Sequence, residues 1–184
     1  MNCLLELEKY LLKYNNSTKI EIYFGEFKSN KLIQTNIENI EIFLNKIKNK
    51  NYTYQYSSKN IGFDFNYYHH IFNNGRINSY KYSFSNIRKV FETNNKNIPS
   101  LCVLINNDIE YIDKFNLPLC ILYSYNVEEI IFKINKYVYL ILSQYITSKN
   151  ENMYSLTIRI KKNLLDNIKL IIETIEYIFF ENNN

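Results

Sequence analysis

Two similar segments near the two ends of the chain limit the folds that it can adopt. Near the N-terminus, residues 19–27 alternate between polar and apolar side chains and lead into a helical pattern from Ile37 to Lys48. Near the C-terminus, residues 154–161 alternate in the same way and lead into a helical pattern from Leu164 to Phe180. Because strand side chains point to opposite faces in turn, we predict that both segments are strands of one antiparallel sheet. Their apolar faces carry Ile20, Ile22, Phe24, Leu156, Ile158 and Ile160.

The opposite faces of these strands are polar and carry the candidate functional residues. The first strand presents Lys19, Glu21 and Tyr23. The polar face of the second strand consists of Ser155, Thr157, Arg159 and Lys161.

The last helix has apolar residues every three to four positions, so we expect one stripe of it to pack on the apolar face of the sheet. This stripe consists of Leu165, Ile168, Ile171, Ile172, Ile175 and Phe179.

Length and composition favour a single intracellular domain, residues 1–184. The chain has 22 basic and 18 acidic residues, and a net charge of +4 is too small to demonstrate nucleic-acid binding by itself. Its 18 Tyr and 12 Phe, with many Asn, Ile and Lys, are typical of A/T-rich codons. Three Cys form neither an even disulfide set nor a metal-ligand spacing. No signal-peptide pattern or membrane-spanning apolar run is found, so we expect a soluble protein without membrane contact.

Between the two terminal segments the pattern is mostly β. A short amphipathic helix is predicted for Cys3–Lys13, and Asn36 is a plausible N-cap for the helix that follows the first strand. Residues 127–146 fit either a helix or a strand. We therefore predict an α+β fold with a mostly antiparallel sheet, closed into a tunnel-like β-barrel with helices packed outside. The other predicted strands are 52–57, 61–72, 76–91, 101–105, 109–112 and 117–125, with a turn at Asn73-Asn74-Gly75.

This order of elements resembles the triphosphate tunnel metalloenzymes, in particular the RNA 5′-triphosphatase domains of mRNA capping enzymes from large DNA viruses. The opening Glu-x-Glu-x-Arg-x-Gly strand of that family is matched by KIEIYFG at residues 19–25. Its Arg-bearing strand is matched by NNGRIN at residues 73–78, and its Ser-x-Glu strand by LYSYN at residues 122–126. Its closing Glu-x-Glu strand is matched by TIR at residues 157–159. The resemblance covers nearly the whole chain.

The departures from the family pattern concern the metal site. Of the carboxylates at the two terminal strands only Glu21 remains, while Lys19, Thr157 and Arg159 occupy the other positions and Asn126 replaces the Glu of the middle strand. Mg²⁺ and Mn²⁺ are held by carboxylate oxygens, and a cation at such a position repels them. We therefore expect no catalytic residue, metal or cofactor.

The resemblance leaves three hypotheses. The first is a non-catalytic domain that serves as a binding or assembly subunit of a viral mRNA capping or transcription complex. The second is an active RNA 5′-triphosphatase that uses Mg or Mn with Glu21 as a catalytic residue. The third is an unrelated α+β interaction protein.

In the first hypothesis Arg76, Lys81 and Arg159 hold an anionic ligand, such as phosphate or an RNA 5′ end. The partner is a protein in a larger complex. The location is intracellular and cytoplasmic, with packaging in a virion as a further option.

Other patterns carry less information about function. His69 and His70 are neighbours on a predicted strand, so they point to opposite faces and are expected at the surface or in a turn. Residues 108–113 contain three acidic residues that we assign to a solvated turn. Tyr52, Tyr54 and Tyr56 share one strand face and could stack on RNA bases, although Tyr is also common in strands. No phosphate-binding Gly-rich loop or serine-nucleophile pattern is present.

Overall fold

In the residues that it describes, the computed structural model has three α-helices and one antiparallel sheet. It describes residues 2–14, 19–28, 31–35, 37–48, 50, 52–63, 67–81, 87–93, 99–106, 111–112, 123–146, 152–161 and 164–180, and some of these by their backbone alone. The helices are α1 (Asn2–Lys13), α2 (Ile37–Lys48) and α3 (Leu164–Ile175), and α3 continues as a π-helical turn, η1 (Glu176–Phe180). The strands are β1 (Lys19–Lys28), β2 (Lys31–Gln34), β3 (Thr53–Phe63), β4 (Tyr67–Phe72), β5 (Ile77–Lys81), β6 (Ile87–Phe91), β7 (Ser100–Asn106), β8 (Tyr111–Ile112), β9 (Tyr123–Lys133), β10 (Val138–Ile146) and β11 (Asn152–Ile160).

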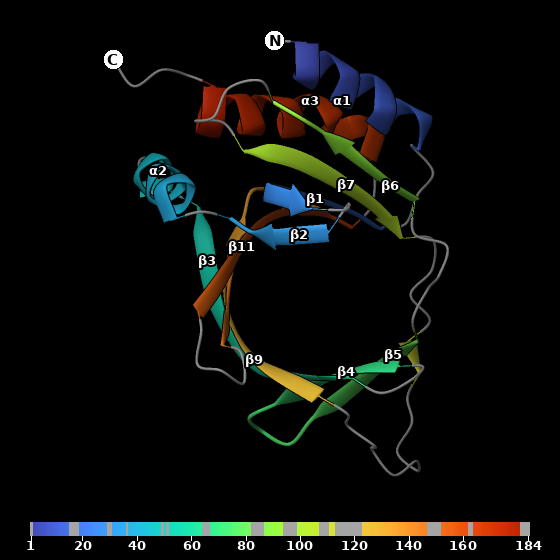
Figure 1. Ribbon diagram of the computed structural model, residues 1–184, viewed down its shortest axis with the longest axis vertical. Helices are drawn as coiled ribbons and strands as arrows, with labels where there is room; N and C mark the ends of the chain where they lie inside the picture. Colours follow the sequence, from blue (N-terminus) through green and yellow to red (C-terminus); the bar gives the residue numbers. More distant parts are fainter. Residues whose placement is uncertain are drawn as a thin grey trace.

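The strands form one sheet in the order β6-β7-β1-β11-β10-β9-β3-β4-β5-β8, and β2 pairs with β1. The two predicted terminal strands are neighbours, with Glu21 opposite Arg159 and Phe24 opposite Leu156. The sheet curls strongly, so that β4 and β5 lie across from β1 and β7 (Figure 1). This confirms the predicted α+β class and tunnel-like architecture. Among the described residues the end strands β6 and β8 do not pair with each other, so closure of the barrel stays a prediction.

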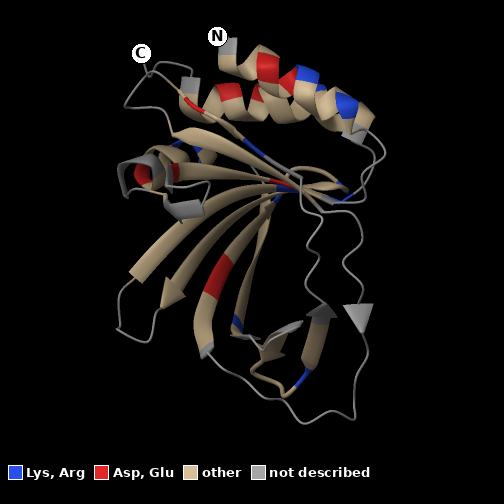
Figure 2. Cartoon of the chain, turned by 45° about the vertical axis from the view of Figure 1, so that its right-hand side comes forward, with Lys and Arg blue, Asp and Glu red and all other residues tan. Residues whose placement is uncertain are grey.

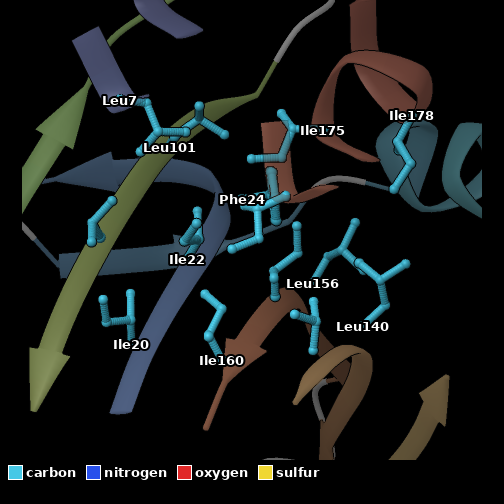
Figure 3. Close-up of a cluster of buried hydrophobic side chains, with 14 of the residues drawn as sticks. Leu7, Ile20, Ile22, Phe24, Leu101, Leu140, Leu156, Ile160, Ile175 and Ile178 are labelled. Carbon is cyan, nitrogen blue, oxygen red and sulfur yellow. The ribbon is translucent and has the colours of Figure 1, made fainter. Parts of the chain in front are cut away.

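The helices cover the outer face of the curled sheet. In Figure 1, α1 and α3 lie side by side above β6, β7 and β1, and α2 lies near the start of β3. The predicted apolar faces of both terminal strands are buried there. Figure 3 shows Leu7 of α1 beside Leu101, and Phe24 below Ile175 of α3. Leu7, Phe24 and Leu101 are completely buried. Removing these apolar side chains from water stabilises the packing of the helices on the sheet.

Thr35, which follows β2, ties the two terminal strands together. Its hydroxyl donates a hydrogen bond to the carbonyl of Phe24 in β1. The backbone N–H of Leu156 in β11 donates to the same hydroxyl at 3.0 Å. The N–H of Thr35 donates to the carbonyl of Tyr154 at 2.9 Å. Because Thr35 is buried, these bonds satisfy backbone groups that water does not reach.

Several predicted boundaries need correction. Residues 127–146, which fitted either a helix or a strand, form most of β9 and all of β10. β3 is longer than predicted and ends at Phe63, and the predicted run 76–91 consists of two strands, β5 and β6. The turn at residues 73–75 is confirmed, and Gly75 has a φ of 81°, which favours glycine. Asn36, residues 108–110 and residues 117–122 lie outside the described residues.

The apolar stripe of α3 is confirmed except at its first member. Ile168, Ile171 and Ile175 are buried, and the ring of Phe179 lies 4.9 Å from that of Phe24 between centroids. Leu165, however, is 55% exposed. The expectation for it was wrong: Leu165 lies in the first turn of the helix, which begins at Leu164, and more than half of its side chain stays in solvent. None of the helices in the described ranges is long and apolar enough to cross a membrane.

Candidate functional site

The inner, concave face of the curled sheet carries polar side chains that are largely buried. They come from β1, β3, β9, β10 and β11, because the alternation that turns Ile20 and Ile158 outward turns their neighbours inward. Charged bands are sparse on these strands, whereas α1 carries both acidic and basic bands (Figure 2). We call the inward set the concave cluster: Glu21, Tyr23, Lys59, Glu129, Ser143, Tyr145, Ser155, Thr157 and Arg159.

The first ion pair of the concave cluster joins the two terminal strands. Arg159 Nε donates to Glu21 Oε1 at 2.7 Å, and the two residues are direct partners in the sheet. The Tyr23 hydroxyl donates to the other carboxylate oxygen, Oε2, at 3.1 Å. The side chain of Glu21 is only 6% exposed and that of Arg159 is 28% exposed. Both carboxylate oxygens of Glu21 are therefore engaged by protein groups.

The second ion pair joins β3 to β9. Lys59 Nζ lies 2.6 Å from Glu129 Oε2, and both side chains are 7% exposed. Between the two ion pairs lie the small side chains of β10 and β11, with Ser143 opposite both Glu129 and Ser155. Taking either charge out of water is costly, and the opposite charge of its partner compensates for that cost.

The pKa values of the neighbouring groups keep the concave cluster in this charge state. Burial raises the pKa of Tyr23 well above its usual value, and the charge of Glu21 raises it further, against a smaller opposite effect of Arg159. Burial also raises the pKa of Tyr145, an increase that hydrogen bonds from Ser155 and Ser143 reduce and the charge of Glu129 reinforces. Burial lowers the pKa of Arg159, but the charge and hydrogen bond of Glu21 outweigh it and the pKa is raised. The tyrosines are therefore neutral and Arg159 is a cation at neutral pH.

The structure brings Glu21 and Arg159 together but places Arg76 elsewhere. Arg76 is exposed at the turn between β4 and β5, where its Nε donates to Asn78 Oδ1 at 3.2 Å. Four strands separate β4 from β1 in the sheet. The side chains of Lys81 and Lys19 lie outside the described residues. Anion binding by Arg76, Lys81 and Arg159 stays a prediction.

Sequence reasoning missed Glu129 and its partner Lys59. Asn126 had been matched to the middle-strand glutamate, but its side chain lies on the outer face, where it accepts a hydrogen bond from Asn60 Nδ2 at 3.2 Å. Glu129, three positions later, faces inward in the same strand. Glu129 could have been identified only if residues 127–146 had been assigned as strands, because only a strand places Val127, Glu129 and Ile131 on one face.

The histidines also differ from expectation. His69 is buried rather than at the surface, and its Nδ1 lies 2.9 Å from Ser79 Oγ of β5. His70 is half-buried against the ring of Phe72. Tyr54 and Tyr56 are 61% and 74% exposed on the outer face of β3.

The concave cluster does not fit a divalent metal. Glu21 is engaged by Arg159 and Tyr23, and Glu129 by Lys59, so each carboxylate already has a neutralising cation. A hard cation such as Mg²⁺ is held by carboxylate oxygens, and here it would have to displace an ammonium or guanidinium group from them. Across the described part of the chain, no group of three or more His, Cys, Asp or Glu residues could hold a metal ion.

The curled antiparallel sheet, with buried charges on its concave face and helices outside, has the fold of solved RNA triphosphatases. Among solved structures, the chain is similar to the RNA triphosphatase Pct1 of S. pombe in complex with the Spt5 CTD. The TM-score is 0.67 at 9% identity, covering 100% of this chain and 94% of that one.

The chain is also similar to the mimivirus capping enzyme triphosphatase. One structure of that protein matches with a TM-score of 0.58 at 11% identity, covering 97% of this chain and 96% of that one. The triphosphatase domain of the trifunctional mimivirus mRNA capping enzyme matches with a TM-score of 0.59 at 11% identity, covering 97% of both chains. No protein-family model and no curated protein sequence matches the chain. At these identities the likeness establishes the fold.

Proposed function

We propose that this protein is a non-catalytic RNA triphosphatase-like domain that acts as a binding or assembly subunit of a viral mRNA capping or transcription complex. The Glu21–Arg159 ion pair carries the proposal. Arg159 stands where the resembling family has a carboxylate of its closing strand. Its guanidinium binds Glu21, the one carboxylate of the opening strand that remains. Because the two charges cancel, the pair no longer attracts a divalent cation, and the guanidinium repels one that comes close.

Two features support a binding role. The concave cluster keeps a partly exposed cation, Arg159, whose planar guanidinium suits a phosphate group. We propose that it holds an anionic ligand such as phosphate or an RNA 5′ end, and that Arg76 and Lys81, from the β4–β5 hairpin on the opposite side of the curled sheet, contact other parts of that ligand. The likeness to mimivirus and S. pombe triphosphatases, one of them in complex with the Spt5 CTD, supports the capping context and a protein partner. The proposal places the protein in the cytoplasm or in a virion.

One observation favours a second candidate, an active RNA 5′-triphosphatase that requires Mg or Mn. Glu129 adds a second buried carboxylate to the concave cluster, on β9, with β10 and β11 between it and the strand of Glu21. If metal and substrate displaced Lys59 and Arg159, these two carboxylates could serve as metal ligands. The fold likeness gives less support to the third hypothesis, an unrelated α+β interaction protein.

The test offers the purified protein a triphosphate-ended RNA with Mg²⁺ or Mn²⁺ and measures phosphate release. We expect no release above the protein-free rate. We also expect no rise in the melting temperature when either metal is added, because no metal site is formed. The matched variants are Glu21→Ala and Glu26→Ala, since Glu26 is an exposed carboxylate on the same strand. Phosphate release that is lost in Glu21→Ala and kept in Glu26→Ala would overturn the proposal and establish the enzyme.

A further inference from the structure

One end of the concave face carries a group of exposed lysines. Lys133 ends β9, Lys136 lies in the turn between β9 and β10, and Lys161 follows β11. All three side chains are exposed. We call them the basic rim. Residues 133–139 and 159–161 together contain four cations and no Asp or Glu.

The basic rim is held in place by its own hydrogen bonds. The Tyr139 hydroxyl donates to the carbonyl of Lys136 at 3.0 Å, and the N–H of Lys161 donates to the carbonyl of Tyr137 at 3.0 Å. Asn135 Oδ1 accepts from two backbone N–H groups of the turn at 2.8 Å each. These bonds fix the backbone positions from which the lysine side chains extend.

The three ammonium groups of the basic rim have no carboxylate partner among the described residues, and those of Lys136 and Lys161 lie against aromatic rings. Lys136 Nζ is 5.4 Å from the centre of the Tyr137 ring, and Lys161 Nζ is 4.8 Å from that of Tyr139. A ring beneath a lysine restricts its motion without neutralising its charge. An anion that binds there therefore meets cations that lose little conformational freedom.

The register connects the basic rim to the Glu21–Arg159 pair. Tyr139 lies opposite Lys133 in β9 and opposite Arg159 in β11, and Arg159 lies opposite Glu21. Lys133, Tyr139 and Arg159 thus form one row across three neighbouring strands on the concave face. Lys161 stands on the same face as Arg159, two residues further along the chain. A chain of phosphates could follow this row from the exposed end inward.

We propose that the basic rim binds the backbone phosphates of single-stranded RNA just downstream of a 5′ end held on the concave face. This inference rests on the proposed function and adds the RNA chain itself as a ligand. Lysines that neutralise phosphates release condensed counterions, so binding weakens with salt by about 0.7 in log–log slope per contact on a single strand. Three contacts correspond to a slope of about 2.

The experiment measures the fluorescence anisotropy of a labelled 12-nucleotide RNA with a 5′-hydroxyl end at several salt concentrations. We expect the Lys133→Gln/Lys136→Gln/Lys161→Gln variant to bind roughly tenfold more weakly at low salt, with a salt slope smaller by about 2. The control variant is Lys9→Gln/Lys13→Gln/Lys48→Gln, which removes three exposed lysines from α1 and α2. It should bind like the wild type, and replacing the three rim lysines by arginine should preserve binding.

Two outcomes would overturn the proposal. One is equal affinity and equal salt slope in the two glutamine variants, which would show that only net charge matters. The other is displacement of the RNA by polyglutamate at the same charge concentration as by unlabelled RNA, which would identify a surface for acidic peptides. Because the probe has no triphosphate, both outcomes are independent of the phosphate-release test. Hydrolysis would refute the non-catalytic role while leaving the basic rim intact.

Discussion

Glu21 and Glu129 are the two buried carboxylates of the concave cluster, and their partners decide the chemistry of this face. Glu21 is bound by Arg159 and Tyr23, and Glu129 by Lys59. The two members of each pair lie on different strands, so each pair depends on the register of the sheet as well as on residue type. Removing one member leaves the other charged and out of water, which is far more costly than the net value of the pair.

At this scale we predict that Glu129→Gln lowers the free energy of unfolding by about 3 kcal/mol, because Lys59 is then buried without a countercharge. Glu128→Gln is the matched control: Glu128 is the preceding residue, exposed on the opposite face, and should change stability by less than about 0.5 kcal/mol. Urea denaturation measures both. A double change of Lys59→Met and Glu129→Leu should recover most of the loss. Equal effects of the two single variants would show that the pair is not buried.

The helices illustrate what periodicity can determine for a single element. In α3 the apolar spacing identified the packed side correctly at Ile168, Ile171 and Ile175, all of which lie in the core. The same spacing included Leu165, which is exposed. Periodicity gives the direction in which a side chain points, whereas burial also requires another element at that position along the helix.

We therefore predict that two similar truncations in α3 have different costs. Ile171→Ala should lower the free energy of unfolding by about 2–4 kcal/mol, because it leaves a cavity among fully buried side chains. Leu165→Ala should lower it by less than about 1 kcal/mol, because most of that side chain remains in water. Thermal and urea unfolding of the two variants give the comparison. Similar losses would mean that another element covers Leu165.

At the scale of the whole molecule, the two ends of the chain supply neighbouring interior strands of the sheet. β1 pairs with β11 and β7, and β11 pairs with β1 and β10. The ion pair between Glu21 and Arg159 spans 138 positions of sequence. Helices from both ends of the chain also share the core, since α1, α2 and α3 all contribute buried residues.

We predict that the chain unfolds as one cooperative unit. Far-UV circular dichroism and tyrosine fluorescence should give the same urea midpoint, because strands from both halves of the chain pair within one sheet in the described residues. Deleting residues 152–184, which removes β11 and α3, should abolish folding of the rest. Deleting only residues 181–184, which removes no described element, is the control. Two separate transitions in the full chain would contradict the single domain.

The sequence by itself determined the local structure of both ends, the apolar and polar faces of their strands, and the α+β class. These properties depend on the alternation of side chains along one segment, so a sequence is sufficient to predict them. It also identified Glu21 and Arg159 as inward residues, because each lies on the polar face of such a strand.

Only the tertiary structure decided which charges meet. Residues 127–146 fit a helix or a strand equally well until pairing with β3 and β11 fixed them as strands, and that choice turned Glu129 toward Lys59. The structure also placed Arg76 at the exposed turn between β4 and β5 and Lys133, Lys136 and Lys161 at one end of the concave face. Such groupings depend on strand order and register, which are set by contacts between segments far apart in the sequence.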